Sequence, residues 1–89
     1  MAKYREKPVI INAIQWTGKN LDEIEGFAGD KFITWWYNHG SIGIQTLGGT
    51  MIANLNDWII KGIGGEFRPC KPDIFLATYE KVTDAEIRD

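Results

Sequence analysis

His39 and Cys70 are the two residues of this chain whose types could form a nucleophile and its base, because the sequence holds one histidine and one cysteine. A thiol next to an imidazole is a common covalent catalyst, and Asp57 or Asp73 could orient the ring. The competing interpretation places His39 in a tight turn with Asn38, Gly40 and Ser41. It treats Cys70, which lies between Pro69 and Pro72, as a small buried apolar group. We favour this structural interpretation, because no catalytic signature surrounds either residue.

The same count argues against a metal centre. One cysteine and one histidine supply two ligands, so a tetrahedral zinc site would need two more from scattered carboxylates. We expect no metal and no cofactor.

Gly62, Gly64 and Gly65 form a glycine-rich segment of the kind that binds phosphate in other proteins. Such loops need a following helix whose amides face the anion. Here residues 66–69, Glu-Phe-Arg-Pro, follow with a strand pattern, which predicts a hairpin turn instead. If the protein binds a small phosphorylated ligand, Lys61 and Lys71 are the first candidates to hold it.

Trp35, Trp36 and Tyr37 are consecutive aromatic residues in a segment with strand composition. Because side chains alternate along a strand, Trp36 lies on one face and the other two on the opposite face. One face should fill the core, and the other is either exposed for a partner or buried as well. Lys31 is the one basic residue near this strand, so base stacking lacks the cations that accompany it in nucleic-acid binders.

Composition limits the function classes. The chain has 89 residues and a formal charge of −2, with 44 % hydrophobic residues and 12 % aromatic ones. This predicts one domain with one core and gives no electrostatic attraction for nucleic acid. The lone cysteine and the lack of a leader-like or membrane-spanning apolar run favour the cytoplasm.

Hydrophobic patterning predicts mostly short strands. Residues 9–16 read as a central strand with two apolar faces, and residues 21–28 as a helix with Asn20 and Glu23 in a capping box. Further strands are predicted at residues 32–37, 42–47, 50–54, 58–61 and 66–69, followed by a helical turn at 72–77 and a last strand at 78–82 that closes against the first. Residues 83–89 read as a polar tail.

The predicted fold class is therefore α+β. We expect a small antiparallel curled sheet or partly open barrel of about five to seven short strands, with one or two short helices. Asp57 should accept hydrogen bonds within its own turn.

Several segments resemble a family of small phage and prophage proteins of the PGDYG-like type, named after a Gly-Asp-aromatic turn. The similarity runs in order from about residue 3 to residue 82, through segments 3–18, 57–62, 65–67, 69–75 and 78–80. Asn56 stands where the family pattern has glycine before Asp57, and asparagine tolerates left-handed geometry better than most residues. The resemblance implies a phage-encoded cytoplasmic protein and brings no catalytic residues.

Two functions compete at this point. The first is a non-enzymatic binding protein that engages a host or phage protein through Trp35, Trp36 and Tyr37, with His39 nearby. The second is a binder or sponge for a nucleotide-type signal that uses Lys61 and Lys71. An enzyme comes third. A two-fold dimer is also expected, because so small an aromatic-rich sheet has difficulty covering its apolar surface and its strand edges.

Overall fold

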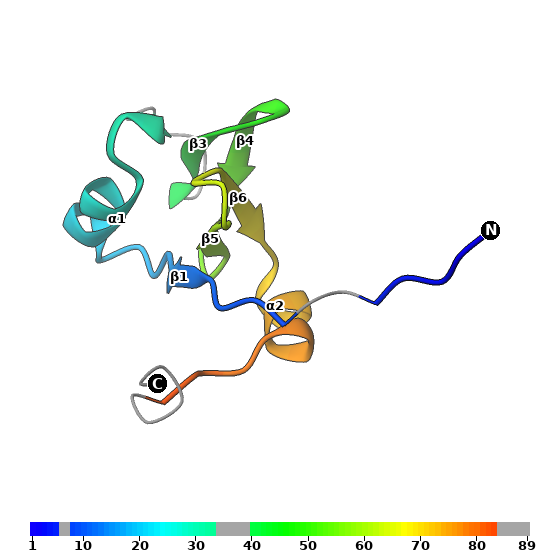
Figure 1. Ribbon diagram of the computed structural model, residues 1–89. Helices are drawn as coiled ribbons and strands as arrows, with labels where there is room; N and C mark the ends of the chain where they lie inside the picture. The colour runs from blue at the N-terminus through cyan, green and yellow to red at the C-terminus, as the bar shows by residue number, and fades with distance from the viewer. Residues whose placement is uncertain (6–7, 34–39, 84–89) are drawn as a thin grey trace.

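A computed structural model gives the fold, and it describes residues 1–5, 8–33 and 40–83. The described chain contains two α-helices and six strands in two antiparallel sheets that do not close into a barrel (Figure 1). In chain order they are β1 (Asn12–Gln15), α1 (Leu21–Ala28), β2 (Phe32–Ile33), β3 (Ile42–Thr46), β4 (Gly49–Ala53), β5 (Trp58–Lys61), β6 (Phe67–Cys70) and α2 (Pro72–Thr78), with a 3₁₀ turn at Gly29–Lys31 between α1 and β2. The predicted α+β class is confirmed.

The first sheet has the order β1-β5-β6, so β5 is its central strand. Ile59 and Ile60 on β5 are both buried although they project to opposite faces. The prediction of a long central first strand is wrong: β1 is a four-residue edge strand, and Val9 and Ile10 before it are exposed. An apolar run is typical of a strand, but a strand also needs backbone partners, and β5 ends where Asn12 pairs with Lys61.

The second sheet has the order β2-β3-β4. β3 and β4 form a hairpin in which Ile42 pairs with Ala53, and β2 pairs antiparallel with β3 through Phe32 and Ile44. The predicted strand at 32–37 is thus present in its described part, and the one at 42–47 is present over residues 42–46. Trp35, Trp36, Tyr37 and His39 lie outside the described residues.

The core lies between the two sheets and α1. Phe27 of α1 packs edge-on against Phe67 of β6, with ring centroids 5.5 Å apart, and the indole N–H of Trp16 donates to the carbonyl of Gly40 at 2.8 Å. The buried apolar residues of this cluster are Trp16, Ile24, Ala28, Ile42, Ile44, Ala53, Ile59 and Phe67.

α1 begins and ends where the sequence predicts, but not for the predicted reason. The Asn20 side chain makes no capping hydrogen bond to the helix. Its Oδ1 accepts from the backbone N–H and the hydroxyl of Thr17 at 2.9 and 3.0 Å, and its Nδ2 donates to the carbonyl of Gln15 at 2.7 Å. Asn20 therefore holds the loop between β1 and α1, and the capping-box prediction is wrong.

The predicted last strand is also wrong. α2 continues to Thr78, whose hydroxyl donates to the carbonyl of Ile74 at 2.7 Å, and residues 79–83 form no strand. This segment still lies near the first strand, because residues 79–82 and 9–13 line one hollow. Neither helix in the described residues is long and apolar enough to cross a membrane.

Candidate functional site

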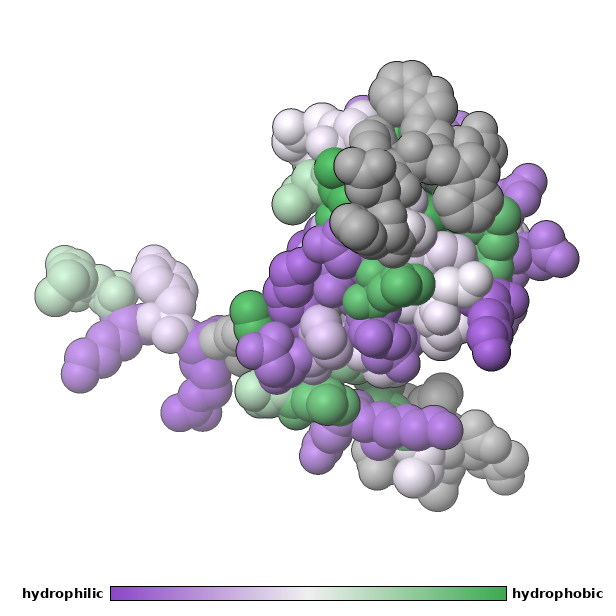
Figure 2. All heavy atoms as spheres, turned by 180° about the vertical axis from the view of Figure 1, so that it is seen from behind, coloured by the Kyte–Doolittle hydropathy of each residue, from purple (hydrophilic) through white to green (hydrophobic). Residues whose placement is uncertain are grey.

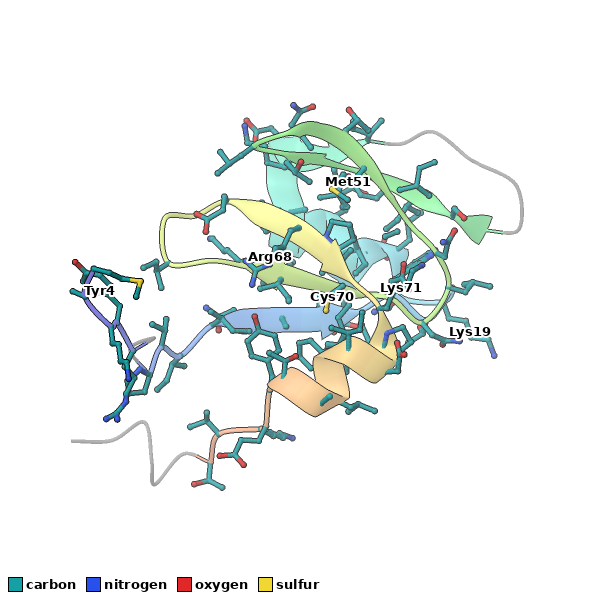
Figure 3. All side chains as sticks on the ribbon, turned by 90° about the vertical axis from the view of Figure 1, so that its right-hand side faces the viewer. Tyr4, Lys19, Met51, Arg68, Cys70 and Lys71 are labelled. Carbon is teal, nitrogen blue, oxygen red and sulfur yellow. The ribbon has the colours of Figure 1, made fainter. Side chains whose placement is uncertain are left out.

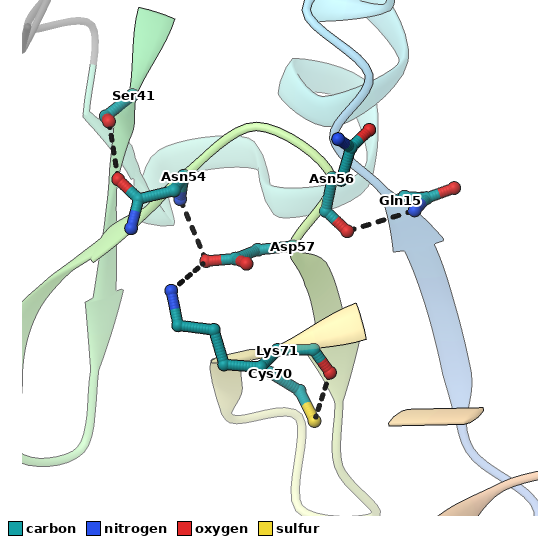
Figure 4. Close-up of polar contacts among 7 residues, drawn as sticks. All are labelled: Gln15, Ser41, Asn54, Asn56, Asp57, Cys70 and Lys71. Atoms are coloured by element: carbon teal, nitrogen blue, oxygen red, sulfur yellow. Dashed lines mark hydrogen bonds and ion pairs between the residues drawn. The ribbon is translucent and has the colours of Figure 1, made fainter. Parts of the chain in front are cut away.

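The turn between β4 and β5 is closed from both sides by Asn54 and Asp57 (Figure 4). The backbone N–H of Asp57 donates to the carbonyl of Asn54 at 3.0 Å, and the Asp57 carboxylate accepts from the backbone N–H of Asn54 at 2.9 Å. The same carboxylate oxygen accepts from the Lys71 ammonium at 3.2 Å. Asp57 is 3 % exposed, and its carboxylate joins the turn to Lys71 at the end of β6.

Asn56 occupies the position of this turn that needs left-handed geometry. Its φ is 73°, the only positive φ of a non-glycine residue in the described part of the chain. A turn with a positive φ at its third residue is of the type that favours glycine or asparagine there. The Asn56 backbone N–H donates to the carbonyl of Trp16 at 2.7 Å, and its carbonyl accepts from the Gln15 side chain at 3.0 Å. The turn is thereby attached to the end of β1.

Gly62, Gly64 and Gly65 lie in the turn that joins β5 to β6. The N–H of Gly62 donates to the carbonyl of Glu66 at 2.8 Å, and the N–H of Gly65 donates to the carbonyl of Gly62 at 3.0 Å. The Glu66 carboxylate lies against the Cα atoms of Gly62 and Gly64, in the space that a Cβ would occupy there. A carboxylate in this place repels phosphate, so the turn offers no anion cradle.

Lys61 and Lys71 are not brought together. Lys61 ends β5 beside the glycine turn, with its ammonium 5.8 Å from the ring centroid of Phe67. Lys71 follows Cys70, which pairs with Trp58 at the opposite end of the hairpin, and it is held by Asp57. The two lysines therefore form no shared phosphate site.

Cys70 is half-buried and free. Burial raises the pKa of its thiol, Arg68 acts in the opposite direction, and Asp57 and Asp73 add to the increase. These effects leave the thiol protonated at neutral pH, which suits an apolar packing group rather than a nucleophile. Within the described ranges, no three His, Cys, Asp or Glu residues are placed to hold a metal ion.

The sequence analysis missed the outer surface of the first sheet, where α2 lies. Phe75 stacks on Trp58 with ring centroids 4.1 Å apart and an interplanar angle of 6°, and Phe75 also contacts Tyr79 at 5.0 Å. The Tyr79 hydroxyl accepts from the Arg68 guanidinium at 2.7 Å. The sequence signal for this surface was the run of three apolar residues at 74–76. Consecutive residues of a helix point in different directions, so a helix this short cannot bury all three.

Two of those residues face solvent. Ile74 is 55 % exposed and Leu76 is 71 % exposed, and α2 has no buried residue. Figure 2, which shows the molecule from behind, has hydrophobic residues in several separate places on this face, one of them low on the molecule. Because Ile74 and Leu76 lie two positions apart, they project from opposite flanks of α2, on either side of Phe75. We call this exposed pair the α2 face.

A groove of about 770 Å³ lies next to α2. Its walls are the segment before β1 (residues 8–11), the β5–β6 turn, and the end of α2 with the segment after it (residues 78–80 and Val82). Its charged lining residues are Glu66, Arg68 and Glu80. Its volume is within the range of ordinary ligand sites. We call it the β1 groove.

Comparisons of the chain with protein-family models, with curated proteins and with solved structures find no match to any of them.

Proposed function

We propose that this chain is a phage- or prophage-encoded, cytoplasmic protein that acts by binding a host or phage protein and not by catalysis. The observation that carries the proposal is the α2 face, a pair of large apolar side chains on a helix that the domain itself hardly covers. Residues 35–37, on which the sequence-based hypothesis placed the contact, lie outside the described residues, so the proposal stands on α2.

The way α2 is attached supports a binding role. A helix of seven residues is unstable alone in water. Two interactions attach it to the first sheet. Phe75 stacks on Trp58, and the hydroxyl of the adjoining Tyr79 accepts a hydrogen bond from Arg68. Fully burying an isoleucine or leucine side chain contributes about 1.5–3 kcal/mol. A partner that covers the α2 face would therefore gain affinity and fix the helix at the same time.

The alternative of a nucleotide-type ligand has less support. The β1 groove carries two carboxylates, Glu66 and Glu80, and one guanidinium, which already donates to Tyr79. A phosphate site would need more positive than negative side chains.

Affinity capture tests the proposal. The bait is the full chain in lysate of the bacterium whose genome or prophage carries the gene, and the variant is Ile74→Glu with Leu76→Glu. The matched control is Leu47→Glu with Met51→Glu, which places the same two charges on exposed apolar positions of the β3–β4 hairpin. We expect a protein that the wild type and the control retain and that the α2 variant loses.

The captured protein must then bind the purified wild-type chain directly. Equal retention by all three baits, with α2 intact by circular dichroism, would contradict the proposal.

A further inference from the structure

We propose that the β1 groove binds the N-terminal arm, residues 1–5, of a second copy of this chain, so that two copies exchange their arms across a two-fold axis. The arm is the segment Met1-Ala2-Lys3-Tyr4-Arg5. This proposal goes beyond the proposed function and uses a different surface.

The arm has the composition of a binding segment and is exposed in its own copy. All five residues are exposed, and Tyr4 is 93 % exposed. The arm extends away from the domain in Figure 1, and Figure 3 shows Tyr4 well outside the body of the protein. Tyrosine is one of the residues that most often dominates an interface, because it buries a large ring at little entropic cost.

The groove offers the matching apolar surface. Val9, Ile10 and Ile63 line it and are exposed. They surround the place where the chain enters β1, and β1 pairs only with β5 among the described strands. An extended segment could therefore lie along this side of the sheet, as added strands do in many complexes.

The charges on the two surfaces are complementary. Lys3 and Arg5 give the arm two positive charges, and in an extended segment they project to one side while Tyr4 projects to the other. The groove carries Glu66 and Glu80 against Arg68, whose guanidinium donates to Tyr79. Lys81 lies in the adjoining smaller hollow. Neither glutamate has an ion-pair partner in the described residues. Glu80 is exposed, and Glu66, half-buried against Gly62 and Gly64, still lines the groove.

The position of the arm makes a reciprocal exchange simple. Residues 8–11, a few positions after the arm, form one wall of the groove. Each arm therefore starts beside the groove of its own copy, which would receive the arm of the other copy. One two-fold axis then places both arms at once, and exchange of identical segments is a low-cost route to a dimer.

A charge-reversal experiment tests the exchange. Variant one carries Lys3→Glu and Arg5→Glu, and variant two carries Glu66→Lys and Glu80→Lys, each as the full chain without an N-terminal tag. We expect the wild type to dimerise in analytical ultracentrifugation and each variant alone to dimerise at least about tenfold more weakly, because like charges then meet in both contacts. An equimolar mixture of the two variants should recover dimers, since each arm then meets a groove of opposite charge.

Controls with the same change in net charge separate this effect from general repulsion. They are Lys19→Glu with Lys31→Glu, and Glu23→Lys with Glu25→Lys, all at exposed positions on or near α1. Because Glu66 lies on a turn, Arg5→Glu and Glu80→Lys serve as a second pair if variant two melts at a lower temperature. A wild type that stays monomeric up to about 200 μM would overturn the proposal, because an exchanged dimer must form at concentrations well above its dissociation constant. Failure of the mixture to recover dimers would overturn it too, and neither result bears on capture through the α2 face.

Discussion

The carboxylate of Asp57 and the backbone N–H of Asn54 are joined at 2.9 Å, while the Asp57 N–H donates back to the Asn54 carbonyl at 3.0 Å. This reciprocal pair closes the β4–β5 turn, and the turn connects the two sheets. Asp57→Ala should lower the free energy of unfolding by about 1–2 kcal/mol, because it removes the buried carboxylate that accepts from the Asn54 backbone N–H in this partly buried turn. Lys71→Ala should cost less than about 1 kcal/mol, since the Lys71 side chain is 54 % exposed. Urea unfolding of both variants measures the difference, and a larger loss from Lys71→Ala would contradict the assigned roles.

Asn56 tests the left-handed position of the same turn. Its φ of 73° suits glycine, so Asn56→Gly should change stability by less than about 1 kcal/mol. Asn56→Val should destabilise by about 1–2 kcal/mol or more, because a β-branched residue is strained there. Thermal melts of the two variants measure the difference in stability. Equal melting temperatures would mean that residue 56 does not have a positive φ.

A substitution of Asn20 can distinguish a helix cap from a residue that holds the loop between β1 and α1. If it were a helix cap, Asn20→Asp would be neutral or stabilising, because aspartate caps as well as asparagine and its charge favours the helix N-terminus. In the structure its Nδ2 donates to the carbonyl of Gln15, and aspartate would place a carboxylate against that carbonyl. We therefore expect Asn20→Asp to destabilise by about 1–3 kcal/mol, measured by chemical denaturation, with Asp22→Asn on the exposed first turn of α1 as the control.

Phe75 should hold α2 in place through its stack on Trp58. Phe75→Ala should cost about 1–2 kcal/mol, less than the loss of a fully buried phenylalanine, and should speed hydrogen exchange in residues 72–78. Leu76→Ala, at an exposed position of the same helix, should leave both quantities nearly unchanged. If the two substitutions act alike, α2 is not held by that stack.

Cys70 should react slowly. Because burial raises the pKa of its thiol, the thiolate fraction at neutral pH is smaller than that of an unfolded cysteine. Alkylation by iodoacetamide at pH 7.5 should be at least about threefold slower in the native chain than in urea, and the rate should still be rising above pH 9. A native rate faster than the rate in urea would instead indicate an activated thiol.

Local patterns predicted much of the fold. Residues 58–61 were predicted as a strand, on which Ile59 and Ile60 project to opposite faces, and the glycine pair 48–49 and the glycine-rich segment 62–65 located the hairpin turns. The sequence overestimated the first strand, because the apolar run of residues 9–11 says nothing about where its partner β5 ends. It predicted a strand at residues 78–82 because Tyr79 and Val82 are apolar positions in a stretch that otherwise turns polar, whereas the helix in fact continues to Thr78.

The site was less predictable, since its contacts join distant parts of the chain. Lys71 was chosen as a ligand contact from its place near glycines, but the ion pair with Asp57, 14 residues away, occupies it. The α2 face depends on which side of the helix Phe75 presents to Trp58, and that choice is made by tertiary packing and not by the helix itself.

Hydrogen exchange of the purified chain with its captured protein partner tests the proposed function most directly. We predict that residues 72–78 become the most strongly protected segment on binding, and that the Ile74→Glu, Leu76→Glu variant binds at least about tenfold more weakly while the Leu47→Glu, Met51→Glu control binds like the wild type. Protection confined to segments away from α2, with unchanged affinity of the α2 variant, would contradict the account.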